Sequence, residues 1–102
     1  MKYLHFLHHR YFRDAEMDQL NQWLMTFAAY NAGPARVREL REEAVSMGLD
    51  PNVWFHNVEV AAAKRIGRET VQYVSNIYKY YIAYSLIVER MQLKATAKEA
   101  LQ

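Results

Sequence analysis

The chain has 102 residues, enough for one domain with a single core and too few for a separate regulatory module. Hydrophobic residues make up 52% and aromatic residues 14%, which excludes intrinsic disorder, while 24% charged residues argue against a membrane protein. The formal net charge of +2 is too small to indicate a nucleic-acid binder, although it suits an acidic polymer.

The sequence contains no cysteine, so disulfides and thiolate metal sites are excluded and the redox compartment stays open. The N-terminus has a basic start but a broken apolar run without a small-residue cleavage site, so no signal peptide is predicted. No stretch approaches the apolar length of a membrane span. If the parent protein is exported, we expect its signal to lie upstream.

Glycine and proline separate five segments with helical periodicity, and no segment shows the alternation of a strand. The first helix is expected over residues 2–13, with Leu4, Leu7 and Tyr11 on one face. The second is expected over residues 15–32, where residues recur at the three-and-four spacing of a buried stripe. That stripe comprises Met17, Leu20, Leu24, Phe27, Ala28 and Asn31.

A third helix is expected after Gly33, with Pro34 as its first residue, because the missing N–H of proline needs no partner there. Its inward residues are predicted to be Val37, Leu40, Ala44 and Met47. Gly48 is expected to end it in a left-handed conformation, and Asp50 to cap a fourth helix over about residues 51–65. The residues expected to point inward from that helix are Trp54 and Val58.

The fifth helix is predicted from about residue 69 to the low nineties, and residues 92–102 are expected to form a frayed tail. Its stripe is predicted to comprise Val74, Ile77, Tyr81, Ser85 and Val88.

Two segments stand out against this helical background. Ala28-Ala29-Tyr30-Asn31-Ala32-Gly33-Pro34 ends a helix with an aromatic residue, an amide and small residues directly before a turn. Taken alone, this pattern is also that of a capped helix end with close packing. In the second segment, which opens the last helix, Tyr73 lies one turn in. Taken alone, it belongs to a tyrosine stripe in the core.

Together the two segments resemble a known family. The order Ala-Tyr-Asn-Ala-Gly-Pro, a spacer helix, and Gly-Arg-Glu-Thr-x-x-Tyr-Val-x-x-Ile-x-x-Tyr-Tyr is similar to the C-terminal half of the soluble lytic transglycosylase domain, in the goose-type lysozyme-like superfamily. The resemblance covers about residues 2–88, includes Lys2-Tyr3-Leu4, and is strongest to membrane-bound members. It implies an all-α partial domain over residues 1–102 that contacts peptidoglycan, from a parent protein of the periplasm or cell envelope.

The resemblance also implies roles for particular residues. Tyr30 and Asn31 would line the saccharide groove beside the catalytic acid, and the hydroxyl of Tyr73 would approach that acid. Ala29 and Gly33 would be the small residues that let sugar or backbone come close.

The family's catalytic acid is absent from this sequence. It lies in a Glu-Ser pair followed by a Gly-Leu-Met-Gln segment, whereas none of the eleven Asp and Glu residues here precedes a serine and no glycine opens the second motif. The family reaction joins the muramyl 6-hydroxyl to the anomeric carbon after the glutamate protonates the glycosidic oxygen. Such acid–base catalysis contributes about 10²–10⁴-fold. We therefore expect no catalytic residue in this chain and no activity from it alone.

The best-placed internal carboxylate is Glu69, although a negative charge in a first helical turn is ordinarily a stabilising neighbour of the helix N-terminus. His5 and His9 have a chelating spacing but lack a third ligand, so no metal is predicted, and no cofactor either. A nucleic-acid partner is not predicted. The alternative function is a non-catalytic helical module that binds glycan or protein.

The half of the domain that is absent from this sequence would cover apolar residues of the half that is present. Those expected to lose this cover are Phe27, Tyr30, Tyr73, Ile77 and Tyr81. A homodimer, or a separate N-terminal half, is therefore the expected partner beside the glycan strand.

Overall fold

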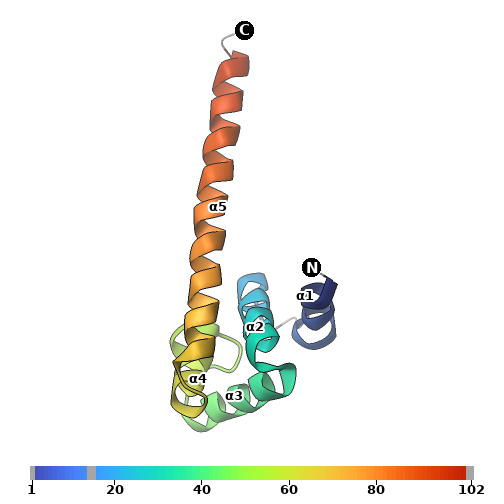
Figure 1. The fold of residues 1–102 in the computed structure, drawn as a ribbon, viewed down its shortest axis with the longest axis vertical. Helices are drawn as coiled ribbons and strands as arrows, with labels where there is room; N and C mark the ends of the chain where they lie inside the picture. The colour runs from blue at the N-terminus through green and yellow to red at the C-terminus, as the bar shows by residue number, and fades with distance from the viewer. Residues whose placement is uncertain (1, 14–15, 101–102) are drawn as a thin grey trace.

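The computed structural model describes residues 2–13 and 16–100, and these are helical throughout apart from short connections. The elements in chain order are α1 (Lys2–Leu7), η1 (His8–Phe12), α2 (Gln19–Ala32), α3 (Pro34–Ser46), η2 (Trp54–Val58), α4 (Glu59–Arg65) and α5 (Arg68–Ala100). The expected all-α class is confirmed. The shorter helices gather around the first half of α5, and the second half projects beyond them, so the molecule measures 59 × 24 × 23 Å (Figure 1).

The first helix changes its winding at His8, where a π-helical turn, η1, begins. In a π-helical turn, residues five apart lie above one another. Leu7 and Phe12 are five apart, and both are buried, whereas Tyr11 is exposed. The expectation that Tyr11 faces inward is therefore wrong, because the wider turn puts Phe12 in its place.

Helix α2 begins at Gln19, later than the predicted residue 15, which lies outside the described residues. Asp18 is the N-cap, and its Oδ1 accepts the backbone N–H of Asn21 at 2.8 Å. Two members of the expected stripe, Leu20 and Asn31, are exposed instead of buried. The other expected members are buried or half-buried: Met17, Leu24, Phe27 and Ala28.

The turn between α2 and α3 is made by Gly33 and Pro34, as expected. Gly33 has φ +98°, which only glycine adopts without strain, and its N–H bonds the carbonyl of Ala29 at 2.7 Å. Pro34 is the first residue of α3, and the far end of that helix is followed by Gly48 with φ +77°, which confirms the predicted left-handed cap. Val37 and Leu40 are buried, as predicted.

The fourth helix is shorter than predicted, because α4 begins at Glu59 rather than near residue 51. Phe55 and His56 leave the helical region within η2, with His56 at φ +63°. The side chain of Asn57 accepts the N–H of Asp50 at 2.9 Å and donates to the carbonyl of Phe55 at 3.0 Å. These bonds compete with helix formation and hold η2 as an irregular turn.

Trp54 lies at the centre of the core, fully buried where η2 meets the helices. Its backbone N–H donates to Oδ1 of Asn21 at 2.9 Å, and Nδ2 of Asn21 donates in turn to Oδ1 of Asp18. One buried amide of α2 therefore satisfies the η2 backbone, a role that the sequence pattern did not indicate. The core is completed by Leu7, Leu24, Met25, Val37, Leu40, Val58 and Val74.

Helix α5 runs from Arg68 to Ala100, beyond its predicted end in the low nineties. Residues 92–100, expected to fray, are helical and all exposed, and residues 101–102 lie outside the described part of the chain. Val74 is buried as expected, but Tyr81 is exposed, because it lies where α5 begins to leave the cover of α2 and only borders a groove with that helix. No helix among the described residues is long and apolar enough to cross a membrane.

Candidate functional site

The end of α2 and the start of α5 pack against each other and bring the two conspicuous sequence segments together. Oγ1 of Thr70 donates to Oδ1 of Asn31 at 2.6 Å across the two helices. Thr70 is buried, whereas Asn31 is exposed. A buried hydroxyl therefore holds the exposed amide in a fixed orientation. The amide nitrogen of Asn31 has no protein partner among the described residues.

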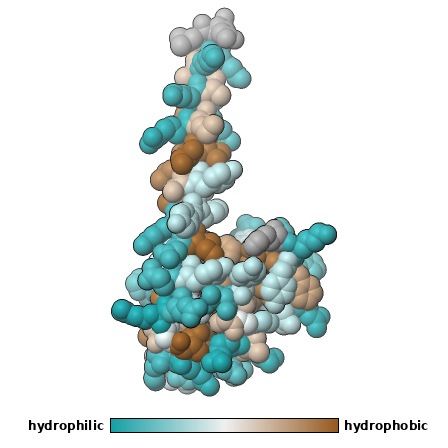
Figure 2. All heavy atoms as spheres, in the orientation of Figure 1, coloured by the Kyte–Doolittle hydropathy of each residue, from teal (hydrophilic) through white to brown (hydrophobic). Residues whose placement is uncertain are grey.

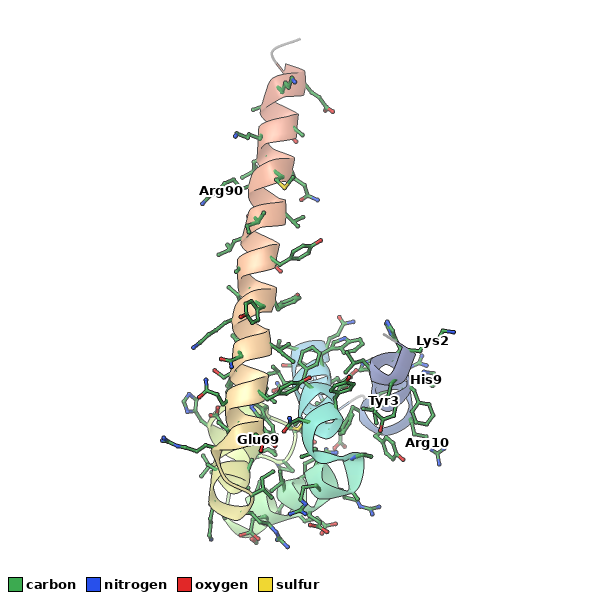
Figure 3. The ribbon with its side chains drawn as sticks, viewed as in Figure 1. Lys2, Tyr3, His9, Arg10, Glu69 and Arg90 are labelled. Carbon is green, nitrogen blue, oxygen red and sulfur yellow. The ribbon has the colours of Figure 1, made fainter. Side chains whose placement is uncertain are left out.

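Two of the predicted groove residues, Tyr30 and Tyr73, stack with ring centroids 6.4 Å apart and planes 10° apart. Tyr3 of α1 leans on the other side of Tyr30, at 5.9 Å and 53°, and Phe6 stacks with Tyr3 at 6.2 Å. We call Phe6, Tyr3, Tyr30 and Tyr73 the aromatic row. It joins α1, α2 and α5, and Figure 3 shows Tyr3 on the side of α1 that faces α2.

Tyr3, Phe6 and Thr70 were not predicted from the sequence to belong to the site. Tyr3 lies in the Lys2-Tyr3-Leu4 segment that carried part of the resemblance, so a signal was present for it but no role had been attached. Thr70 lies in the Glu-Thr-x-x-Tyr pattern and could have been found as the residue one turn before Tyr73. The contribution of Phe6 depends on the packing of α1, which the sequence pattern does not determine.

A shallow pocket of about 330 Å³ lies next to Asn31. It is lined by Asn31, Ala32, Arg36, Ile66, Glu69 and Thr70. Glu69 is exposed in the first turn of α5, on the side that faces α2 (Figure 3). One cationic and one anionic side chain thus flank an amide, which suits a polar, hydroxyl-rich ligand.

The two small residues of the predicted site have different positions. Ala29 is buried in the core, so it can serve a groove only through the packing beneath it. Gly33 is at the turn, and a Cβ there would meet nothing within 4 Å. Its glycine is required by the positive φ rather than by a close neighbour.

Burial raises the pKa of the Tyr73 hydroxyl above its ordinary value of 10.0, and the neighbouring Tyr30 raises it further. The hydroxyl is therefore protonated at neutral pH. It can donate a hydrogen bond to a carboxylate or to a sugar oxygen but cannot act as a base there.

This raised pKa predicts how stability depends on pH. The folded state favours the neutral form of Tyr73. The contribution of this preference to stability is complete below the unfolded-state pKa of about 10, and it is lost as the pH rises through the higher folded-state pKa. Urea unfolding between pH 7 and about pH 11 should show a smaller alkaline loss for Tyr73→Phe than for the wild type. The exposed Tyr11→Phe is the matched control, and an equal change in both variants would contradict the prediction.

The histidines of α1 and η1 make contacts that account for them without a metal. His8 stacks on Trp23 at 4.1 Å and 4°, and its Nε2 donates to Gln22 at 2.9 Å. His5 meets the edge of the same indole at 5.7 Å, and Nδ1 of His9 accepts from Arg13 at 3.3 Å. Within residues 2–13 and 16–100, no three His, Asp or Glu side chains are grouped to hold an ion.

Two curated proteins are similar to this chain. A membrane-bound lytic murein transglycosylase F from Desulfosudis oleivorans is 36% identical over 92 residues, which cover 78% of this chain and 20% of that protein. A protein of the same name from Shewanella woodyi is 36% identical over 81 residues, covering 67% of this chain and 17% of that protein. This chain is related to lytic murein transglycosylases.

The similarity covers only a small part of the two related proteins. The chain spans about a fifth of the length of the lytic murein transglycosylases that it matches. No family model matches it. No solved structure matches it either. The relation to lytic murein transglycosylases agrees with the resemblance found in the sequence.

Proposed function

We propose that this chain forms one wall of the saccharide groove of a peptidoglycan lytic transglycosylase, and that the general acid comes from outside the sequence. The observation that carries the proposal is the pairing of Tyr30 with Tyr73 and of Asn31 with Thr70. These contacts place the two family-like segments on one surface, in a chain related to proteins of that name. The parent protein would then act at the cell envelope.

The aromatic row suits a glycan strand. Tyr30 and Tyr3 are about half exposed, so their rings offer apolar faces beside the polar pocket at Asn31. Sugar rings present C–H faces to aromatic side chains and hydroxyl and acetamido groups to amides. In the proposed complex, Tyr30 would contact a sugar face, and Nδ2 of Asn31 would donate to an acetamido or hydroxyl oxygen.

Tyr73 would act as a positioning residue for the missing acid. A tyrosine hydroxyl is protonated at neutral pH, and burial raises the pKa of this one further, so it can donate to a glutamate carboxylate. A donor to the charged form of a carboxylate lowers the pKa of that carboxylate, and the stacked ring of Tyr30 fixes the direction of the donor. The chain would thereby tune and orient an acid that it does not supply.

Glu69 is the carboxylate that lines the pocket at Asn31. It is exposed in the first turn of α5, where an acidic side chain is a favourable neighbour of the helix N-terminus. That structural role, and the threonine rather than serine that follows it, argue against Glu69 as the general acid.

We expect the isolated chain to release no 1,6-anhydromuropeptides from purified peptidoglycan, because it has no suitable acid. Mass spectrometry of a digest measures the products directly. The control is Glu69→Gln, which should be indistinguishable from the wild type. Anhydro products that appear with the wild type and vanish in Glu69→Gln would contradict the proposal and assign the acid to this chain.

The alternative is a non-catalytic helical module that binds glycan or protein. Glycan binding without catalysis uses the same aromatic row, so the digest does not separate the two. The two functions are separated by a variant of the parent protein. If an upstream Glu-Ser motif is present in the same reading frame and its Glu→Gln change abolishes the anhydro products, the enzyme is supported. If that Glu→Gln variant kept full activity, the non-catalytic binding module would be the remaining function for this chain.

A further inference from the structure

The second half of α5 carries an apolar face that the rest of the molecule leaves uncovered. We call residues 79–100 the arm, which at 1.5 Å per residue is about 33 Å long. Figure 2 shows hydrophobic side chains along the arm, between hydrophilic ones. Tyr80, Tyr81, Tyr84, Ile87 and Met91 are each more than half exposed.

These side chains follow a regular spacing. Tyr81, Tyr84, Val88, Met91 and Ala95 alternate at intervals of three and four residues, and we call them the seam. The same alternation continues backwards through Ile77 to Val74, which is buried in the core. The seam is thus the core-facing stripe of α5 carried past the helices that cover it. A three-and-four alternation along one helix face is the pattern of a two-helix contact.

The base of the arm opens into an apolar groove between α2 and α5, a cavity of about 390 Å³. Its lining includes Leu20 and Trp23 from α2 and Tyr78 and Tyr81 from α5. The groove is continuous with the seam, because Tyr81 belongs to both. A helix lying along the seam would therefore end in the groove.

We propose that the occupant is the arm of a second copy of this chain, paired antiparallel across a two-fold axis. The spacing of the seam sets the register, since Val88 then meets the partner's Met91 and Tyr84 meets the partner's Ala95. Large residues lie near the base of the seam and a small one near its tip, so antiparallel pairing matches large with small. Parallel pairing would instead set tyrosine against tyrosine and Lys98 against its own copy.

The antiparallel arrangement also uses the groove. The tip of each arm reaches the base of the other, where Lys98 would lie over the ring of the partner's Tyr81, a favourable cation–aromatic contact. A two-fold pair is self-complementary and closes, so it forms a dimer rather than a chain of copies.

The exposed area suits a stable dimer. The side chains of Tyr80, Tyr81 and Tyr84 are 76%, 57% and 68% exposed, which amounts to about 400 Å² at the size of a tyrosine ring. Ile87 and Met91 bring the face to about 600 Å² per chain. Specific interfaces bury about 800 Å² per partner, so the arm alone approaches this area and the α2 residues of the groove add to it. Uncovered apolar faces of this extent are uncommon on monomers.

The test is the mass of the whole chain in solution, with matched variants on the two sides of the arm. The chain is 12.1 kDa, and light scattering should give twice that mass at about 100 µM protein. Val88→Glu puts a charge in the seam and should raise the dimer dissociation constant at least about 30-fold. Leu86→Glu changes an exposed residue on the opposite side of the arm and should leave it unchanged. Glutamate favours helix more than valine does, so circular dichroism should show an intact arm in both variants.

Orientation is tested with cysteines, which the chain lacks. Oxidation of a mixture of Tyr84→Cys and Ala95→Cys should give the mixed disulfide dimer, and Ala95→Cys alone should stay uncrosslinked. A monomeric wild type, or a dimer broken by Leu86→Glu rather than Val88→Glu, would overturn the proposal. So would self-crosslinking of Ala95→Cys. A monomer that instead binds anionic phosphatidylglycerol vesicles through the arm would overturn it too and assign the arm to a membrane surface.

Discussion

Trp54→Ala should lower the free energy of unfolding by about 3–5 kcal/mol, the loss expected for removal of a buried aromatic side chain. Trp54 is fully buried at the meeting point of α2, α3, α4 and η2, so no single element can move in to fill the space. Domains of this size have only about 5–15 kcal/mol of stability. The variant should therefore be largely unfolded in mild urea, with the loss of helical circular dichroism as the measurement.

Two controls separate packing from hydrogen bonding at this position. The indole Nε1 of Trp54 is buried without a partner among the described residues. Trp54→Phe keeps most of the ring and removes that unpaired donor, so it should cost less than about 1.5 kcal/mol. Val45→Ala on the exposed face of α3 should change stability by no more than about 0.5 kcal/mol. A loss in Trp54→Phe as large as in Trp54→Ala would contradict this description of the core.

The helical class and much of the core could be predicted because their signals are local. Apolar spacing placed Leu24, Val37, Leu40, Trp54 and Val58 inside, and they are buried. The turns at Gly33 and Gly48 followed from the conformational freedom of glycine, and both have positive φ.

The predictions failed where helix winding, local side-chain hydrogen bonds or the cover over an apolar face decide the outcome. The π-helical turn η1 buries Phe12 in place of Tyr11, and the side-chain hydrogen bonds of Asn57 stabilise η2 as an irregular turn instead of a regular α-helix. Neither changes the periodicity of apolar residues. Tyr81 has the spacing of a core residue but is exposed, because periodicity shows that a face is apolar without showing what covers it.

The sequence predicted which residues belong to the candidate site but not how they contact one another. Tyr30, Asn31 and Tyr73 came from a resemblance, and the structure adds the contacts that join them. Thr70 was missed because one buried threonine in a helix carries no distinctive pattern. Tyr3 was missed because its contact with Tyr30, 27 positions further along the chain, depends on how α1 docks.

Tyr30→Ala should weaken binding of a muropeptide at least about tenfold, the effect of losing a central aromatic contact in a binding site. Tyr30 lies between Tyr3 and Tyr73, so its removal also frees both neighbouring rings to move. Isothermal titration of the chain with a muropeptide measures the change. Tyr30→Phe keeps the ring and should lose much less.

The matched control is Tyr11→Ala, which removes another tyrosine of similar exposure away from the aromatic row. Its muropeptide affinity should equal that of the wild type. If Tyr11→Ala and Tyr30→Ala weakened binding equally, the effect would reflect general loss of aromatic surface rather than a defined groove.

In the proposed complex, Tyr3, Tyr30, Asn31 and Tyr73 form one glycan-binding surface. An NMR titration of the labelled chain with a GlcNAc-MurNAc muropeptide tests this most directly, because it reports on every residue at once. We expect saturable shifts at these four residues and at Thr70, which is bonded to Asn31. Shifts confined to His5, His8 and His9, or no saturable shift at Tyr30 and Asn31, would contradict the account.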